Sequence, residues 1–202
     1  FPKLGKGGRW CWFTAAPIKA ADGSVLGAIE TLWDRTERRK AEQLGKQKNL
    51  ELARNVEQLQ RSEQTMAQII NGSTIPTFVL NGQHVVTHWN KALERLTGYS
   101  AAKMVGTRHQ WVPFWDKERA TMADVILDQR SEQEIWELYG GQWKKSDLID
   151  GAYEAEVFFP KLGSGGKWLF FTAAPIRSAD GSVVGAIETL WDTTEKKEAE
   201  SQ

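Results

Sequence analysis

The phrase GAIETLWD occurs twice in the chain, at residues 27–34 and again at residues 185–192. When residues 1–42 are aligned with residues 159–200, 31 of the 42 positions are identical. Self-similarity at this level indicates two copies of one structural unit. The second copy follows a further segment that the first copy lacks. We therefore expect a complete domain that closes near residue 195, preceded by the tail of a truncated first domain at residues 1–35.

The sequence of the second copy predicts the end of an antiparallel sheet. Its aromatic and β-branched segments favour strands, and glycine-bearing connections of hairpin length separate them. These expected strands cover residues 152–159, 167–176 and 182–191. They predict a three-stranded antiparallel meander.

The segment ahead of the meander predicts a second hairpin and several helices. Residues 77–80 and 84–89 are the hairpin candidates. Two short helices should follow and end at Gly98 and Gly106, because glycine commonly terminates helices. We expect a longer helix over residues 116–130, with Met122, Val125 and Ile126 at helical spacing. The order of elements predicts an α+β domain with one antiparallel sheet.

Composition limits the partners, the location and the cysteine chemistry that we expect of this chain. The chain has 41% hydrophobic residues, 26 basic residues and 26 acidic ones. A balanced charge gives no general attraction to nucleic acid, so no nucleic-acid partner is expected. No apolar run reaches the ~18 residues that span a bilayer, which favours a cytoplasmic protein or the cytoplasmic part of a membrane-anchored sensor. The single cysteine, Cys11, excludes an internal disulfide, and no metal site is expected.

The run WNKALERLTGYSAAKMVG at residues 89–106, together with the closing phrases DRTE and DTTE, resembles the PAS domain family. The resemblance covers residues 73–195 fully and residues 1–37 as a truncated tail. It implies a PAS fold with a pocket between the sheet and the central helices. It also implies a sensing or docking module placed ahead of an effector such as a histidine kinase, a diguanylate cyclase or a chemoreceptor. The resemblance places the complete PAS domain at residues 71–195 and the start of an output helix at residues 196–202.

Residues 36–70 link the two units and predict a long helix. The segment has no proline, is charged and glutamine-rich, and is interrupted only by Gly45. Its apolar positions follow a heptad pattern, with Glu63 as the polar exception. The other seam positions are Leu52, Val56, Leu59, Met66 and Ile70. The pattern predicts a parallel coiled coil in a homodimer, and the alternative is a single helix lying on its own domain.

Each repeated phrase ends at a strand-to-helix junction. Asp34 precedes Glu37 by three residues, and Asp192 precedes Glu195 in the same way. This spacing matches a capping box, in which the aspartate accepts an amide hydrogen bond and the glutamate reaches back. The junction is either a good helix start alone or also a signalling hinge.

The resemblance also implies what a cofactor would need. Haem-binding members use a histidine on the central helix, and residues 116–130 contain none, since His84, His88 and His109 lie elsewhere. Light-sensing flavin members need a cysteine motif, which residues 106–115 lack. Haem is therefore not expected, and non-covalent flavin stays open because aromatic residues could surround a planar ring or simply fill the core.

The candidate ligand pocket combines residues from both halves of the domain. Trp136 and Tyr139 lie in an insertion at residues 131–151, where we expect one or two helical turns with both rings on one face, serving as a lid or as a surface excursion. Glu188 shares a strand face with Val184, Ala186 and Leu190. Either that face is partly exposed, or the carboxylate pairs with a ligand or with an arginine such as Arg108. The full expected pocket comprises Trp89, Asn90, Trp111, Phe114, Trp115, Met122, Trp136, Tyr139, Phe170, Thr172 and Glu188.

Three functions fit the sequence. The first is a sensor that binds a small ligand or cofactor and relays its state through helices to a downstream effector. The second is a dimerisation or spacer module without a ligand, and the third is a flavin or haem redox sensor. We find no phosphate-binding glycine loop, no HExxH and no glycine-flanked nucleophilic serine, so the chain is not expected to be an enzyme. We expect the exposed apolar sheet of residues 1–34 to be covered by a partner chain or by absent residues.

Overall fold

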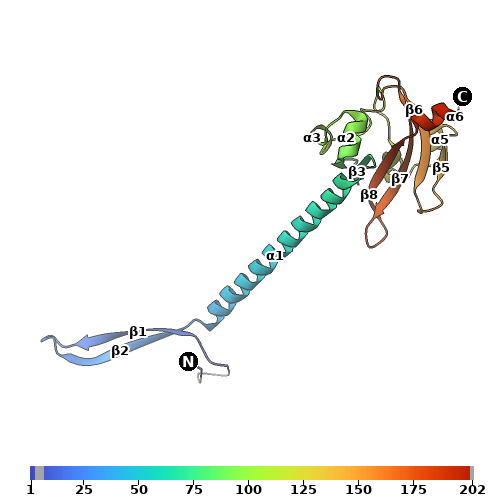
Figure 1. Ribbon diagram of the computed structural model, residues 1–202. Helices are drawn as coiled ribbons and strands as arrows, with labels where there is room; N and C mark the ends of the chain where they lie inside the picture. Colours follow the sequence, from blue (N-terminus) through green and yellow to red (C-terminus); the bar gives the residue numbers. More distant parts are fainter. Residues whose placement is uncertain (3–6, 201–202) are drawn as a thin grey trace. The chain divides into compact units, whose positions relative to one another are not determined.

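The computed structural model describes residues 1–2 and 7–200 (Figure 1). The chain divides into two compact units, Phe1–Glu63 and Gln64–Gln202. The long helix that the sequence predicted is present as α1 (Thr36–Gly72), which begins in the first unit and ends in the second. It continues through Gly45 without a break. In the described part of the chain, no helix combines the length and the apolar character needed to cross a membrane.

The first unit is a hairpin followed by the start of α1. Strands β1 (Cys11–Lys19) and β2 (Val25–Asp34) pair antiparallel. Phe1 and Pro2 are not in a strand, and residues 3–6, which match part of the glycine-bearing connection in the second copy, lie outside the described residues. Apolar side chains of the hairpin are exposed, including Phe13 and Leu32, each about half exposed. The first unit therefore contains sheet without a core of its own.

The second unit is built on a six-stranded antiparallel sheet of order β4-β3-β8-β7-β6-β5. The β3–β4 hairpin and the β6–β7–β8 meander confirm the predicted strands. The strands are β3 (Thr77–Asn81), β4 (Val86–Trp89), β5 (Trp143–Lys145), β6 (Tyr153–Phe159), β7 (Lys167–Arg177) and β8 (Val183–Asp192). The α+β fold class is confirmed.

Short helices complete the second unit, and their bounds are α2 (Lys91–Thr97), α3 (Ala101–Met104), α4 (Met122–Leu127), α5 (Glu132–Tyr139) and α6 (Thr194–Glu200). Gly98 ends α2 in the left-handed conformation, as expected, with φ 77°. Figure 1 shows α2 and α3 next to each other beside the β3 end of the sheet. Their buried side chains, with those of α4 and α5, join one core cluster on one face of the sheet.

The predicted long helix over residues 116–130 is wrong. The observed helix α4 spans only Met122–Leu127. Thr121 starts it through a capping box with Asp124, in which each residue's side chain binds the other's backbone N–H. A cap of this kind fixes a helix start, so the residues before Thr121 stay outside the helix.

The insertion at residues 131–151 is only partly as predicted. Its helical turns are present as α5, but the insertion also forms β5, a short edge strand paired with β6 that the sequence analysis missed. Trp136 and Tyr139 do not share a face: Tyr139 is 6% exposed and Trp136 is 60% exposed. Tyr139 belongs to the core, and Trp136 is largely exposed.

The two sequence copies adopt the same hairpin. All nine paired positions of β1–β2 match those of β7–β8, from Cys11↔Asp34 and Leu169↔Asp192 onward. Both hairpins carry an irregularity at the equivalent place, between Ile18 and Lys19 and between Ile176 and Arg177. The sequence repeat is therefore a repeat of backbone register.

Candidate functional site

Buried side chains from the sheet and the helices meet in the region where the sequence placed the ligand pocket. Phe78 on β3, Leu93 on α2 and Phe171 on β7 are all at most 2% exposed. Of the predicted pocket residues, four belong to this core, and Trp115 packs against it; the four are Trp89, Phe114, Met122 and Tyr139. The structure thus brings the predicted aromatic group together as a packed interior, with Phe114 contacting Phe159 at 5.3 Å between ring centroids.

Phe170 and Thr172 do not face this interior, so their assignment to the pocket is wrong. Their neighbours Leu169, Phe171 and Ala173 are the buried residues of β7. Side chains alternate along a strand, which puts Phe170 and Thr172 on the opposite face. There Phe170 contacts the ring of Trp191 at 5.8 Å.

Glu188 on β8 is the one acidic side chain that the sheet itself places in the core. It is 4% exposed, which excludes the alternative in which Glu188 lies on a partly exposed face. Its partner is not Arg108, which is exposed. Instead, the backbone N–H of Ala123 donates a 2.8 Å hydrogen bond to its carboxyl group. Burial raises the pKa of Glu188 to about 8, and the negative charge of Asp124 adds to the rise.

Asp124 is the centre of a polar cluster on α4 that the sequence analysis did not identify. It accepts hydrogen bonds from the Gln110 amide at 2.8 Å and from the Thr121 hydroxyl at 2.8 Å. His84 lies between two carboxylates, with Nδ1 at 2.7 Å from Asp124 and Nε2 at 3.2 Å from Asp128. The motif TxxD at residues 121–124 was a visible capping signal that could have located this cluster.

Asn90 was predicted to line the pocket but serves the backbone instead. It is fully buried, and its side-chain oxygen accepts hydrogen bonds from the N–H groups of Thr77 and Leu93. Its amide group donates to the carbonyl oxygens of Ile70, Ser73 and Ile75. Asn90 therefore caps α2 and ties the last turn of α1 to the start of β3.

The remaining predicted groups have other surroundings. Trp111 is half-buried, and its indole nitrogen is buried without a hydrogen-bond partner within the described residues. His88 contacts Thr87 at 3.1 Å, and His109 is exposed. Cys11 lies on β1, at the position matched by Leu169 on β7. None of the histidines is brought into the core cluster.

A cavity of about 560 Å³ lies on the outer face of the sheet, near its β5 edge. Trp168 and Phe170 line it, together with Lys197 of α6. Two ion pairs flank the aromatic side chains: Lys144–Glu154 at 3.1 Å and Lys197–Glu156 at 2.8 Å. The sequence analysis missed this surface because it assigned Phe170 to the interior.

The junction between β8 and α6 is tightly bonded. Asp192 accepts hydrogen bonds from the N–H and hydroxyl groups of Thr194, and it pairs with Lys167. Although partial burial opposes it, the hydrogen bonds from Lys167 and Thr194 lower the pKa of Asp192. Thr194 in turn accepts the N–H of Trp168 at 3.0 Å, and Lys197 lies over the Trp168 ring at 5.5 Å.

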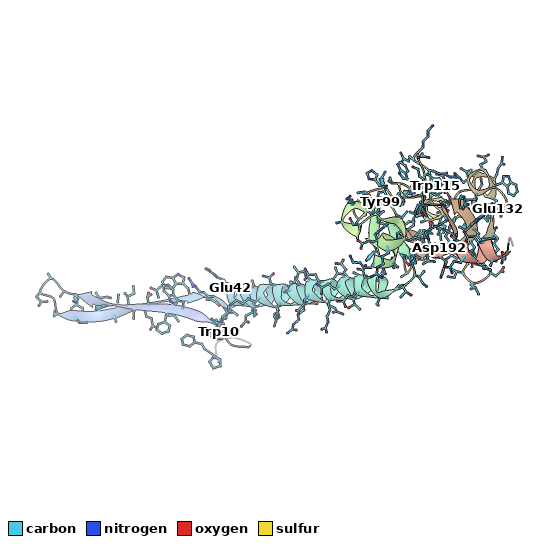
Figure 2. All side chains as sticks on the ribbon, turned by 45° about the horizontal axis from the view of Figure 1, so that its top comes forward. Trp10, Glu42, Tyr99, Trp115, Glu132 and Asp192 are labelled. Carbon is cyan, nitrogen blue, oxygen red and sulfur yellow. The ribbon has the colours of Figure 1, made fainter. Side chains whose placement is uncertain are left out.

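The junction between β2 and α1 repeats these contacts. Asp34 accepts the N–H of Thr36 at 3.0 Å and pairs with Arg9. Thr36 accepts the N–H of Trp10 at 2.9 Å, and Arg39 lies over the Trp10 ring at 4.0 Å. Figure 2 shows Trp10 where the hairpin meets the helix.

The predicted capping boxes are only half present. Both aspartates accept the amide hydrogen bond, but from the residue two positions on. Glu37 pairs with Lys40 at 3.0 Å, and in the described residues neither Glu37 nor Glu195 accepts the N–H of the aspartate. The sequence signal therefore located both junctions correctly and assigned the wrong role to the glutamates.

Comparison with known proteins gives one family match and several structural ones. A family model described as "PAS domain" matches residues 74–195. A search of curated proteins gives no match. Similar solved structures include that of an RNA-binding light-oxygen-voltage receptor, which is 19% identical in sequence and has a TM-score of 0.45. The match covers 68% of this chain and 34% of the receptor chain.

Two further similar structures are single PAS domains. The one from Bordetella pertussis BvgS has 15% identity, covers 69% of this chain and 92% of that chain, and has a TM-score of 0.43. The one from an HTR-like protein of Haloarcula marismortui has 11% identity, covers 69% and 98%, and has a TM-score of 0.44. This chain spans about a third of the light-oxygen-voltage receptor's length.

Proposed function

This chain belongs to the PAS domain family, and we propose that its PAS domain is a sensory module that relays the state of its interior through helices to a downstream effector. The effector would be of the histidine kinase, diguanylate cyclase or chemoreceptor type, and any catalysis would belong to it. A small ligand or cofactor would enter between sheet and helices. A cytoplasmic location suits such an effector.

One observation carries this proposal: the strand that holds Glu188 in the core continues directly into the exit helix. Four residues after Glu188, Asp192 bonds the first turn of α6. The hydroxyl group of Thr193 donates to Glu156 on β6, and Lys197 pairs with the same carboxylate. A displacement of β8 or β6 would therefore act on α6 at bonded points rather than through a flexible linker.

The proposal predicts that loosening this junction frees α6. Thr194→Val removes the acceptor for the Trp168 N–H and the hydroxyl bonded to Asp192. A helix cap contributes about 1 kcal/mol, so amide exchange in α6 should rise about fivefold while that in β7 stays unchanged. Hydrogen exchange measured by NMR gives both rates. Glu198→Gln, on the same helix, is the control, and unchanged α6 exchange in Thr194→Val would refute the bonded relay.

We also propose that residues 1–35 are the closing part of another PAS domain. The matched register and the matched junction support this, as does the exposure of Phe13 and Leu32, whose counterparts Phe171 and Leu190 are buried. Either a partner chain or further PAS residues would cover the hairpin. In this arrangement α1 would carry the output of one PAS domain to the next.

Homodimerisation through α1 is part of the proposal. Four of the five apolar seam side chains are exposed, between 46% for Val56 and 62% for Leu52 and Leu59, Ile70 is half-buried, and no residue of α1 is buried. Charges at seam positions oppose coiled-coil pairing. The double variant Leu52→Lys/Leu59→Lys should weaken dimerisation about 100-fold, as followed by analytical ultracentrifugation. The double variant Gln58→Lys/Gln64→Lys adds the same charge off the seam and should leave the dimer intact; equal weakening by both would contradict the seam.

The alternative is a dimerisation or spacer module that binds no ligand. Native mass spectrometry of the freshly purified chain separates the two functions. A bound small molecule, or a melting temperature that rises with a metabolite, supports the sensor. A tight dimer that shows neither a bound small molecule nor a rise in melting temperature supports the spacer module. An absorbance spectrum tests a flavin or haem redox sensor directly, because both cofactors are coloured.

A further inference from the structure

Glu188 is a buried carboxyl group whose surroundings on balance oppose a charge: burial outweighs the backbone N–H groups of Met122 and Ala123, which favour the ionised form. Its neighbours across the sheet are Ala173 on β7 and Phe78 on β3, both apolar. The nearest fixed hydrogen bond comes from the backbone of α4 at Ala123. Within residues 1–2 and 7–200, no lysine, arginine or histidine forms an ion pair with Glu188. A carboxylate buried without a cation is costly, and the group keeps its proton instead.

The charged groups packed around Glu188 add to this preference. Asp124 on α4 carries a like charge, and Tyr139 on α5 is a buried phenol whose pKa is raised, first by burial and then by Glu188. Arg119 and Arg130 act on Tyr139 and oppose that rise. His84, beyond Asp124, carries a positive charge only when protonated.

The bond between Glu188 and Ala123 joins β8 to the first turn of α4. That helix also packs on β7 and on β3. Any opening that lifts α4 from the sheet would let water reach the Glu188 carboxyl group. Its raised pKa would then fall toward the ordinary value. The closed state therefore holds a proton that the open state releases at neutral pH.

We infer that Glu188 is a proton-controlled latch: it stays buried between the sheet and α4 with its proton, and its ionisation in contact with water accompanies the release of α4. The proton is then a ligand of the PAS interior, and alkaline conditions favour the open state. The effect of the latch on the exit helix α6 rests on the relay proposed above, because Glu188 lies on the strand that leads into α6. The release of α4 from the sheet does not depend on that relay.

Amide exchange of the purified chain, measured by NMR between pH 5.5 and 7.5, tests the latch. Rates are divided by the chemical exchange rates at each pH, which leaves the opening equilibrium. Proton release on opening should raise the opening constants of Ala123 and Val125 about tenfold per pH unit. In Glu188→Gln, which keeps an acceptor for Ala123 but does not titrate, these constants should be independent of pH.

The β7 amides, such as that of Phe171, report global unfolding and serve as the internal reference. The latch requires that Ala123 opens with a larger constant than Phe171. Equal constants, or no pH dependence at Ala123 in the native chain, would overturn it. The Thr193 amide, bonded to Trp168, reports the junction. If Ala123 follows pH and Thr193 does not, the latch stands and the relay to α6 fails.

Discussion

Replacing Asn90 with alanine is expected to destabilise the PAS unit by about 4 kcal/mol, because five hydrogen bonds depend on this one side chain. The loss leaves the buried N–H groups of Thr77 and Leu93 without their acceptor. A buried donor that loses its partner costs about 1–3 kcal/mol. Urea unfolding, followed by the NMR signals of buried residues such as Leu169 and Leu190, gives the free energy of unfolding.

The same variant should detach the last turn of α1 from the PAS unit. Two groups donate to the Ile70 carbonyl in the described structure: the backbone N–H of Ser73, just past the end of α1, and the Asn90 amide, which comes from the start of α2. Amides near Ile70 should therefore exchange faster than global unfolding alone explains. This result would identify Asn90 as the residue that couples the entering helix to the sheet.

Two matched variants separate the contributions of Asn90. Asn90→Ser keeps an acceptor for the Leu93 N–H and should recover the capping contribution of about 1 kcal/mol. Asn71→Ala changes an exposed asparagine at the end of α1 and should stay within about 0.5 kcal/mol of the native chain. If Asn90→Ala were no more destabilising than Asn71→Ala, the buried network would have no energetic role.

The strands and junctions were predictable because their signals are local. The meander followed from aromatic and β-branched runs between glycine turns, and the junctions followed from aspartates just before charged segments. The polar core was not predictable in this way. Asn90 and Asp124 acquire their roles from groups that the fold brings to them, the Ile70 carbonyl and the Gln110 side-chain amide among them.

The face of β7 was assigned wrongly for a similar reason. Phe170 and Phe171 are equally apolar, so composition does not say which one faces the core. Pairing decides it: Ala173 lies opposite Glu188, which puts Phe171 and Ala173 on the buried side. An irregularity between Ile176 and Arg177 shifts the register of the hairpin by one residue on β8, and no local pattern revealed it.

The largest expected pH effect on stability comes from Glu188. Its folded-state pKa is raised, chiefly by burial, from the ordinary 4.5 to about 8. Between these values the native state binds a proton that the unfolded state has released, so the free energy of unfolding falls as pH rises. The contribution is complete below pH 4.5 and is lost by pH 8. A shift of this size corresponds to a loss of about 5 kcal/mol.

Comparison with Glu188→Gln isolates this contribution, because glutamine has a similar shape and does not titrate. Urea unfolding at several pH values between 5 and 8 should give a falling free energy for the native chain and a flatter profile for the variant. The shifted pKa of Asp180 lies outside the range from pH 5 to pH 8, because hydrogen bonds from Ser178 and Ser182 lower it to about 2. Parallel profiles for the two proteins would mean that Glu188 is ionised in the folded state. That result would mean that the backbone N–H groups of Met122 and Ala123, which favour the ionised form, outweigh the burial of the carboxyl group and the charge of Asp124.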